Sequence, residues 1–190
     1  MKKYSVILYQ LTRPISYLFL NHEAGKVYNW QIPLLLAAFS TVILFFVSDI
    51  QMLAGEGGLI ESLTSLIINL PGFLIAALAA IATFNRPVID QEMIDAPVID
   101  IKVGDTELKN SPLSRRDFLL RLFSFLTVDS IFLVIYAKVG SIIPVPSWFI
   151  TEFYIAEWIF SFVFLVIFWQ LLTLILFGMY YLCERLNLNL

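Results

Sequence analysis

Long runs of apolar residues dominate the chain, and short polar stretches separate them. A helix needs about 20 mostly apolar residues to cross the roughly 30 Å hydrocarbon core of a bilayer. Four runs come close to this length or exceed it, over residues 30–47, 59–84, 118–136 and 155–182. The pattern therefore predicts an all-α integral membrane protein with four transmembrane helices.

The runs divide the chain into an N-terminal segment (1–29), two helices (30–84), a hydrophilic loop (85–117), two more helices (118–182) and a tail (183–190). In the N-terminal segment, apolar residues recur at helical spacing beside basic ones, which predicts a cytoplasmic interfacial helix. In the loop, "DIKVGDTELK" alternates around Gly104 and Asp105 and predicts a small β-hairpin. Ser114, three residues before Asp117, predicts the N-cap of the third helix.

Composition and charge place the chain in a membrane and orient it there. Hydrophobic residues make up 59% of the chain and charged residues 14%, whereas soluble domains average about 45–50% and about 25%. If both termini and the loop are cytoplasmic, eleven of the twelve Lys and Arg residues lie inside and only Lys138 lies outside. Because basic residues are retained on the cytoplasmic side, we predict a multi-pass protein of the inner membrane with both termini cytoplasmic.

Asp129 lies near the middle of the third apolar run, where a charged side chain costs about 2.5–3.5 kcal/mol on insertion scales. Asn69 and Gln170 lie at a similar depth in other runs, and Thr127 is close by. Two interpretations are open. In the structural one, Asp129 hydrogen-bonds to Asn69, Gln170 or Thr127 and fixes the helix register. In the functional one, this intramembrane polar layer lines a water-filled path or forms a switchable contact.

The second run contains "LPGFLIAALAA", in which Pro71 predicts a kink. Gly72, Ala76 and Ala80 fall on one face and predict close packing against another helix, within the subunit or between subunits. Candidate headgroup-binding or partner-binding residues lie in and beside the loop: Lys102, Glu107, Arg115 and Arg116.

The chain carries no pattern typical of catalysis. It has one histidine, His22, and one cysteine, Cys183, so neither a His-rich nor a thiol-rich metal site is expected. Phosphate-loop, nucleophile-elbow and zinc-protease motifs are missing from the sequence. The net charge of −3 argues against a nucleic-acid-binding face. We therefore expect no enzyme activity, cofactor, metal or direct nucleic-acid binding.

Three classes of function remain: a membrane sensor or adaptor, a pore or channel-like effector, and an accessory subunit of a transporter. A pore-lining helix needs a continuous polar stripe, and each run has only a few polar residues. The loop over 85–117 is the longest hydrophilic element and is suited to holding a soluble cytoplasmic partner. The sequence thus favours the sensor or adaptor, with the bilayer, further copies of the chain and a soluble protein as partners.

The layout resembles the small four-span membrane subunit of the Kiwa anti-phage defence system. The likeness rests on a length near 190 residues, four spans, both termini inside and one cytoplasmic loop between the second and third spans. The segments "LSRRDFLLRLF" and "LPGFLIAALAA" are those to align first. The resemblance implies a homo-oligomeric inner-membrane sensor of phage infection with a soluble nucleic-acid-binding effector on its cytoplasmic face. It assigns no functional residues.

Overall fold

The computed structural model describes residues 10–20, 23–47, 57–83, 87–92, 98–103, 106–142 and 153–185, together with Ile7, Leu53 and Asn85. Four stretches of helix in this part of the chain are long and apolar enough to cross a bilayer: Val27–Val47, Leu59–Thr83, Arg115–Ile142 and Ile155–Cys183. The predicted all-α membrane protein with four transmembrane helices is confirmed. The third helix is longer than its apolar run, with 28 residues, because it begins before Phe118 and continues beyond Tyr136 to Ile142.

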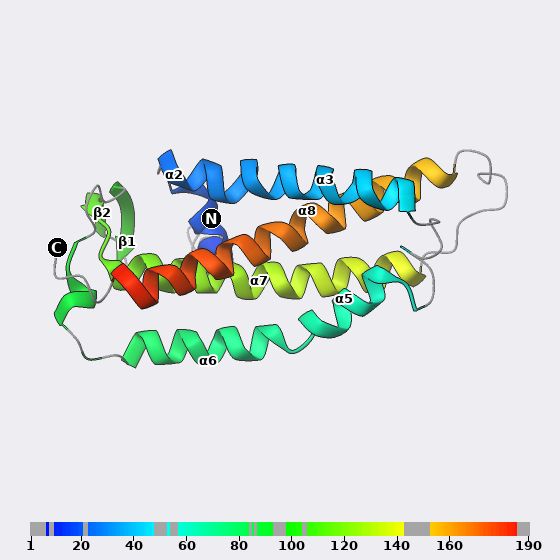
Figure 1. Ribbon diagram of the computed structural model, residues 1–190. Coiled ribbons are helices and arrows are strands. Elements are labelled where there is room, and N and C mark those ends of the chain that lie inside the picture. The colour runs from blue at the N-terminus through cyan, green and yellow to red at the C-terminus, as the bar shows by residue number, and fades with distance from the viewer. Residues whose placement is uncertain are drawn as a thin grey trace.

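Helix α7 (Arg115–Ile142) is the centre of the bundle. It packs against α6 (Leu70–Thr83) and α8 (Phe153–Tyr180), and α3 (Ile32–Val47) packs on α8. Figure 1 shows the helices side by side, with α3 and α6 on the two outer faces. In the most apolar 18-residue window of the third span 61% of the residues are buried, against 11% in that of the first span. The core is therefore built around α7, and the outer helices turn most of their apolar side chains toward lipid.

Proline divides the second span into two helices, α5 (Leu59–Ile67) and α6, with a turn at Ile68 and Asn69 between them. Pro71 has no backbone N–H, so the carbonyl of Ile67 cannot accept the usual helical hydrogen bond. Proline is tolerated in the first turn of a helix, which is where α6 places it. The kink predicted at Pro71 is thus a complete break in the helix.

A side-chain cap starts α7. The Ser114 hydroxyl accepts a hydrogen bond from the backbone N–H of Asp117 at 3.1 Å and donates one to the Asp117 carboxylate at 2.8 Å. The first bond satisfies one of the backbone N–H groups that have no partner at the start of a helix. The carboxylate of Asp117 is also favourable there, because the N-terminus of a helix carries a partial positive charge. The predicted N-cap at Ser114 is confirmed.

The loop forms a two-stranded antiparallel hairpin of β1 (Val98–Val103) and β2 (Thr106–Pro112). Val103 pairs with Thr106 in the register, and the pairing shifts between Ile99 and Ile101. The predicted turn at Gly104 and Asp105 lies outside the described residues. The hairpin, the start of α7 and the end of α8 lie at one end of the bundle (Figure 1). This is expected, because a chain that crosses the membrane twice, through α7 and then α8, returns to the side from which it started.

The described part of the N-terminal segment combines several short helical turns, and most of the predicted interfacial helix before Gln10 lies outside the described residues. The described part contains a short 3₁₀ helix, η1 (Arg13–Phe19), that packs on α7, followed by α2 (Glu23–Lys26) and a turn of π-helix, η2 (Val27–Gln31), which continues into α3. Tyr17 is buried, whereas Leu11 and Phe19 are 70% and 83% exposed. The segment therefore contributes one side chain to the core and keeps apolar side chains available to lipid.

Candidate functional site

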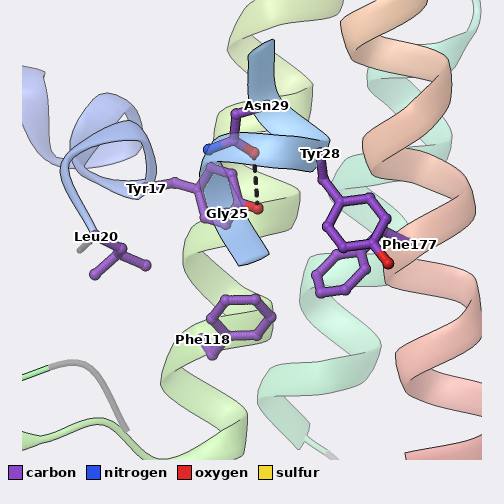
Figure 2. A pocket seen from close by; sticks show the side chains of 7 residues that line it. All are labelled: Tyr17, Leu20, Gly25, Tyr28, Asn29, Phe118 and Phe177. Atoms are coloured by element: carbon purple, nitrogen blue, oxygen red, sulfur yellow. Dashed lines mark hydrogen bonds between the residues drawn. The ribbon is translucent and has the colours of Figure 1, made fainter. Parts of the chain in front are cut away.

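A buried polar cluster of Tyr17, Asn29 and Gln170 joins the N-terminal segment to the bundle. The Tyr17 hydroxyl donates a hydrogen bond to Asn29 Oδ1 at 3.3 Å, drawn in Figure 2. Gln170 Nε2 of α8 donates to the backbone carbonyl of Asn29 at 2.9 Å. Asn29 lies in the π-helical turn η2, and such turns are frequent at functional sites. Asn29 thus connects η1 and η2 to α8, whose Gln170 is 141 residues away in the sequence.

Aromatic side chains surround this cluster. The Tyr17 ring stacks on Phe125, with centroids 5.6 Å apart, and Tyr28 stacks on Phe177 at 4.9 Å. Tyr17, Asn29, Phe118 and Phe177 contribute to the lining of a cavity of about 10 Å³, seen in Figure 2, so it has room for at most one water molecule. Burial raises the pKa of the Tyr17 hydroxyl, so this group is a neutral donor at physiological pH.

Asp129 lies on the α7 face that looks toward η1 and α8. It is four residues beyond Phe125, which stacks on Tyr17, and seven beyond Leu122, which lies next to Gly178 of α8. Residues at these spacings share one helix face. The rings of Phe118 and Tyr181 are in contact, and α7 and α8 run antiparallel. Asp129 is eleven residues after Phe118 on α7, and Gln170 is eleven residues before Tyr181 on α8. Asp129 is thus level with Gln170 of the polar cluster.

Asp129 has no hydrogen-bond partner for its buried Oδ2 atom among the described residues, although the residue is only 8% exposed. The three predicted partners are occupied or distant. Asn69 is exposed at the turn between α5 and α6, Gln170 donates to Asn29, and the Thr127 hydroxyl donates to the Phe123 carbonyl at 2.8 Å. The expected bonds from Asn69, Gln170 or Thr127 to Asp129 are therefore not formed. A buried carboxyl oxygen without a partner is costly, and this favours the functional interpretation of Asp129.

At the hairpin end of the bundle, Arg116 and Asp90 form what we call the loop clamp, together with the last carbonyls of α6. The Arg116 guanidinium binds both Asp90 carboxylate oxygens, at 2.6 and 3.1 Å, and donates to the carbonyls of Ile81 and Ala82 at 2.8 and 3.0 Å. The hydrogen bond from Arg116 lowers the pKa of Asp90. The clamp therefore ties η3 (Pro87–Asp90), the end of α6 and the start of α7 together.

Both predicted headgroup-binding or partner-binding arginines have partners within the chain. Arg116 binds Asp90 and the carbonyl of Ile81. Arg115 is 7% exposed, so it is also turned inward, and its backbone N–H donates to the Gln91 carbonyl. Lys102 and Glu107 are cross-strand partners in the hairpin, and their side chains lie outside the described part of the structure.

The ridge of Gly72, Ala76 and Ala80 does not pack within the protein. All three residues are exposed, and α6 instead turns Leu74 and Ile81 inward. A Cβ atom added at Gly72 would meet nothing within 4 Å. The ridge therefore lacks a packing partner among the described residues of its own chain, and packing between subunits stays a prediction.

Sequence reasoning did not single out Tyr17, Asn29 or Asp90. Asn29 directly precedes the first apolar run, so it resembles the end of a surface segment, and no spacing signal links it to Gln170, 141 residues away.

Within the described residues, no group of three or more His, Cys, Asp or Glu side chains is placed to hold a metal.

Comparison with family models, with known proteins and with solved structures finds no match to this chain. Its class therefore rests on the fold, which is that of a multi-pass membrane protein whose membrane part is all α.

Proposed function

We propose that the protein is an oligomeric inner-membrane sensor and adaptor that detects a perturbation of the envelope and holds or controls a soluble cytoplasmic effector. Phage infection is the stimulus that the resemblance to the Kiwa subunit implies. The observation that carries this proposal is the loop clamp, because one guanidinium binds both the segment leading to the hairpin and the end of a membrane helix.

The loop clamp provides a route from the bilayer to the hairpin. Charge-assisted bidentate bonds are among the stronger hydrogen bonds of proteins, and the bridge between Glu92 and Ser114 adds a backbone link at the same place. A shift of α6 relative to α7 must therefore move the base of the hairpin. We place this end in the cytoplasm because the sequence concentrates its Lys and Arg residues there.

The adaptor function is tested by replacing residues 93–111 with a neutral Gly/Ser linker of equal length, which keeps Asp90, Glu92 and Ser114 to Asp117. Soluble products of the neighbouring reading frames are co-expressed with the protein, and their retention on purified membranes is measured. We expect the linker variant to insert normally and to lose retention of the partner. A linker replacing residues 143–150, on the opposite side of the membrane, is the control and should leave retention unchanged.

Two outcomes would contradict the adaptor. Either the linker variant retains the partner as well as the wild type does, or the wild type retains none of the candidates. Ion conductance of proteoliposomes containing the wild-type chain, in the absence of any retained partner, would favour the pore or channel instead. An effect confined to the activity of a co-expressed transporter would favour the accessory subunit.

The oligomer is proposed to form through the exposed face of α6. Ile68 is 53% exposed and Asn69 is exposed at the break in the second span, yet irregular backbone at membrane depth is tolerated only where protein or water covers it. Gly72 serves no packing purpose within the chain, although glycine in a helix costs roughly 0.5–1 kcal/mol relative to alanine. A second copy of the same ridge covers the break and uses the close approach that small residues allow.

Disulfide cross-linking tests this interface in a Cys183→Ser background, which removes the native thiol. Oxidation in native membranes should yield a covalent dimer with Ala76→Cys and much less with Ile75→Cys, a neighbouring exposed position at the same depth. Adding Gly72→Leu should suppress the Ala76→Cys dimer, since the larger side chain holds the helices apart. Equal cross-linking at both positions, or none at Ala76→Cys, would rule this interface out.

A further inference from the structure

A groove of about 480 Å³ lies between the end of η1 and the first turns of the first span. Its volume is in the range of roughly 300–1,000 Å³ typical of ligand sites. Leu18 and Phe19 contribute to one wall, and Lys26, Trp30 and Gln31 contribute to the other. The polar cluster and the loop clamp do not account for this groove.

The groove has the chemistry of a membrane interface. Lys26 and Gln31 are exposed, Trp30 is 49% exposed and Phe19 is 83% exposed. The first span begins at Val27, so the groove lies where the chain enters the bilayer. Tryptophan favours the headgroup level, and lysine reaches from there toward phosphate. The exposed Phe19 ring would be unfavourable in water but favourable in contact with lipid, so the groove suits a lipid better than a water-soluble ligand.

The charge of the groove selects among lipids. Lys26 is the one charged side chain among the described residues that line it. A lysine at such a groove favours an anionic partner, and basic pockets beside transmembrane helices bind anionic headgroups. Below the groove, Leu34 and Leu35 of α3 are 42% and 71% exposed, and this apolar surface continues into the bilayer in the direction that an acyl chain takes.

We propose that this groove binds one anionic phospholipid, with its phosphate at Lys26, its glycerol region beside Trp30 and Gln31, and an acyl chain along Phe19 and α3. This inference is independent of the proposed adaptor function. Asn29 lines both the groove and the small cavity beside Tyr17. A bound lipid thus touches the residue that connects the N-terminal segment to α8.

The test uses the purified full chain and native mass spectrometry, with phosphatidylglycerol and phosphatidylcholine of identical acyl chains as probes. The wild type should retain phosphatidylglycerol in preference to phosphatidylcholine. Lys26→Gln should lower retention of phosphatidylglycerol about fivefold, the factor expected from one Lys at a charged surface, and leave phosphatidylcholine unchanged. Lys26→Arg should keep the preference, and Lys138→Gln, the same change on an exposed lysine of α7, should not alter it.

Three results would overturn the proposal. The first is equal retention of the two lipids by the wild type. The second is unchanged retention of phosphatidylglycerol by Lys26→Gln, with the far-ultraviolet circular dichroism of the variant showing an intact fold. The third is displacement of phosphatidylglycerol by free glycerol phosphate, because the groove would then recognise a soluble phosphate and not a lipid.

Discussion

Replacing Asp129 by leucine is expected to stabilise the folded bundle by about 1–3 kcal/mol, the usual cost of a buried polar group without a partner. In the native protein Asp129 is buried on the α7 face toward η1 and α8, and its Oδ2 atom has no partner among the described residues. Unfolding in mixed micelles returns the carboxyl group to water, so folding must remove its hydration. Leucine has no hydration to lose, although its larger side chain offsets part of this gain by overpacking. Reversible unfolding in sodium dodecyl sulfate, followed by tryptophan fluorescence, measures the change.

The matched control is Asp129→Asn, which keeps the size and polarity of the side chain and removes its charge. If the carboxyl group serves only packing, both variants retain activity, measured as partner retention on membranes. If Asp129 is a functional group, Asp129→Leu gains stability and loses activity while its oligomeric state stays normal. A lower stability of both Asp129→Leu and Asp129→Asn would contradict this view, because overpacking cannot explain the loss in the asparagine variant and the carboxyl group would then have favourable interactions in the folded state.

Substitution of Gly140 by alanine is expected to destabilise the contact between α7 and α8 by about 1–3 kcal/mol, the typical cost of overpacking. A Cβ atom at this position would overlap the ring of Phe160. That ring cannot move aside freely, because it stacks on Tyr136 with centroids 4.7 Å apart and the Tyr136 hydroxyl donates to the Phe160 carbonyl. The same unfolding experiment in mixed micelles reports the loss.

Gly72→Ala is the control for this prediction, since a Cβ at Gly72 meets nothing within 4 Å. It should leave the stability of the monomer unchanged or raise it by roughly 0.5–1 kcal/mol through helix propensity. Combining Gly140→Ala with Phe160→Leu should recover part of the lost stability, because the smaller side chain makes room. Equal effects of Gly140→Ala and Gly72→Ala would show that close packing at Gly140 is unimportant.

Features that follow from local chemistry were predictable from the sequence. The four spans follow from the length of the apolar runs, the start of α7 from the hydroxyl of Ser114, and the break in the second span from the missing N–H of Pro71. Each depends on a few neighbouring residues and on properties of the backbone. No knowledge of the tertiary arrangement is needed for them.

The candidate site was harder to predict because a sequence gives the depth of a residue in the membrane but not the rotation of its helix in the bundle. Asp129 and Asn69 have similar depths, yet Asp129 points toward η1 and α8 while Asn69 is on an outer face. Arg115 and Arg116 are neighbours in sequence, but about 100° of helical rotation separates them. One is therefore buried, and the other binds Asp90.

The pairing of α3 with α8 has a consequence for biogenesis. Of the four spans, the one that is synthesised first packs on the one that is synthesised last, through bonds from Trp169 to Ser40 and from Gln170 to Asn29. Until α8 has been synthesised, the first span lacks this neighbour, and the carbonyl of Asn29 has no donor from α8. A chain truncated before α8 therefore leaves its earliest helix loose in the bilayer, where membrane proteases select their substrates.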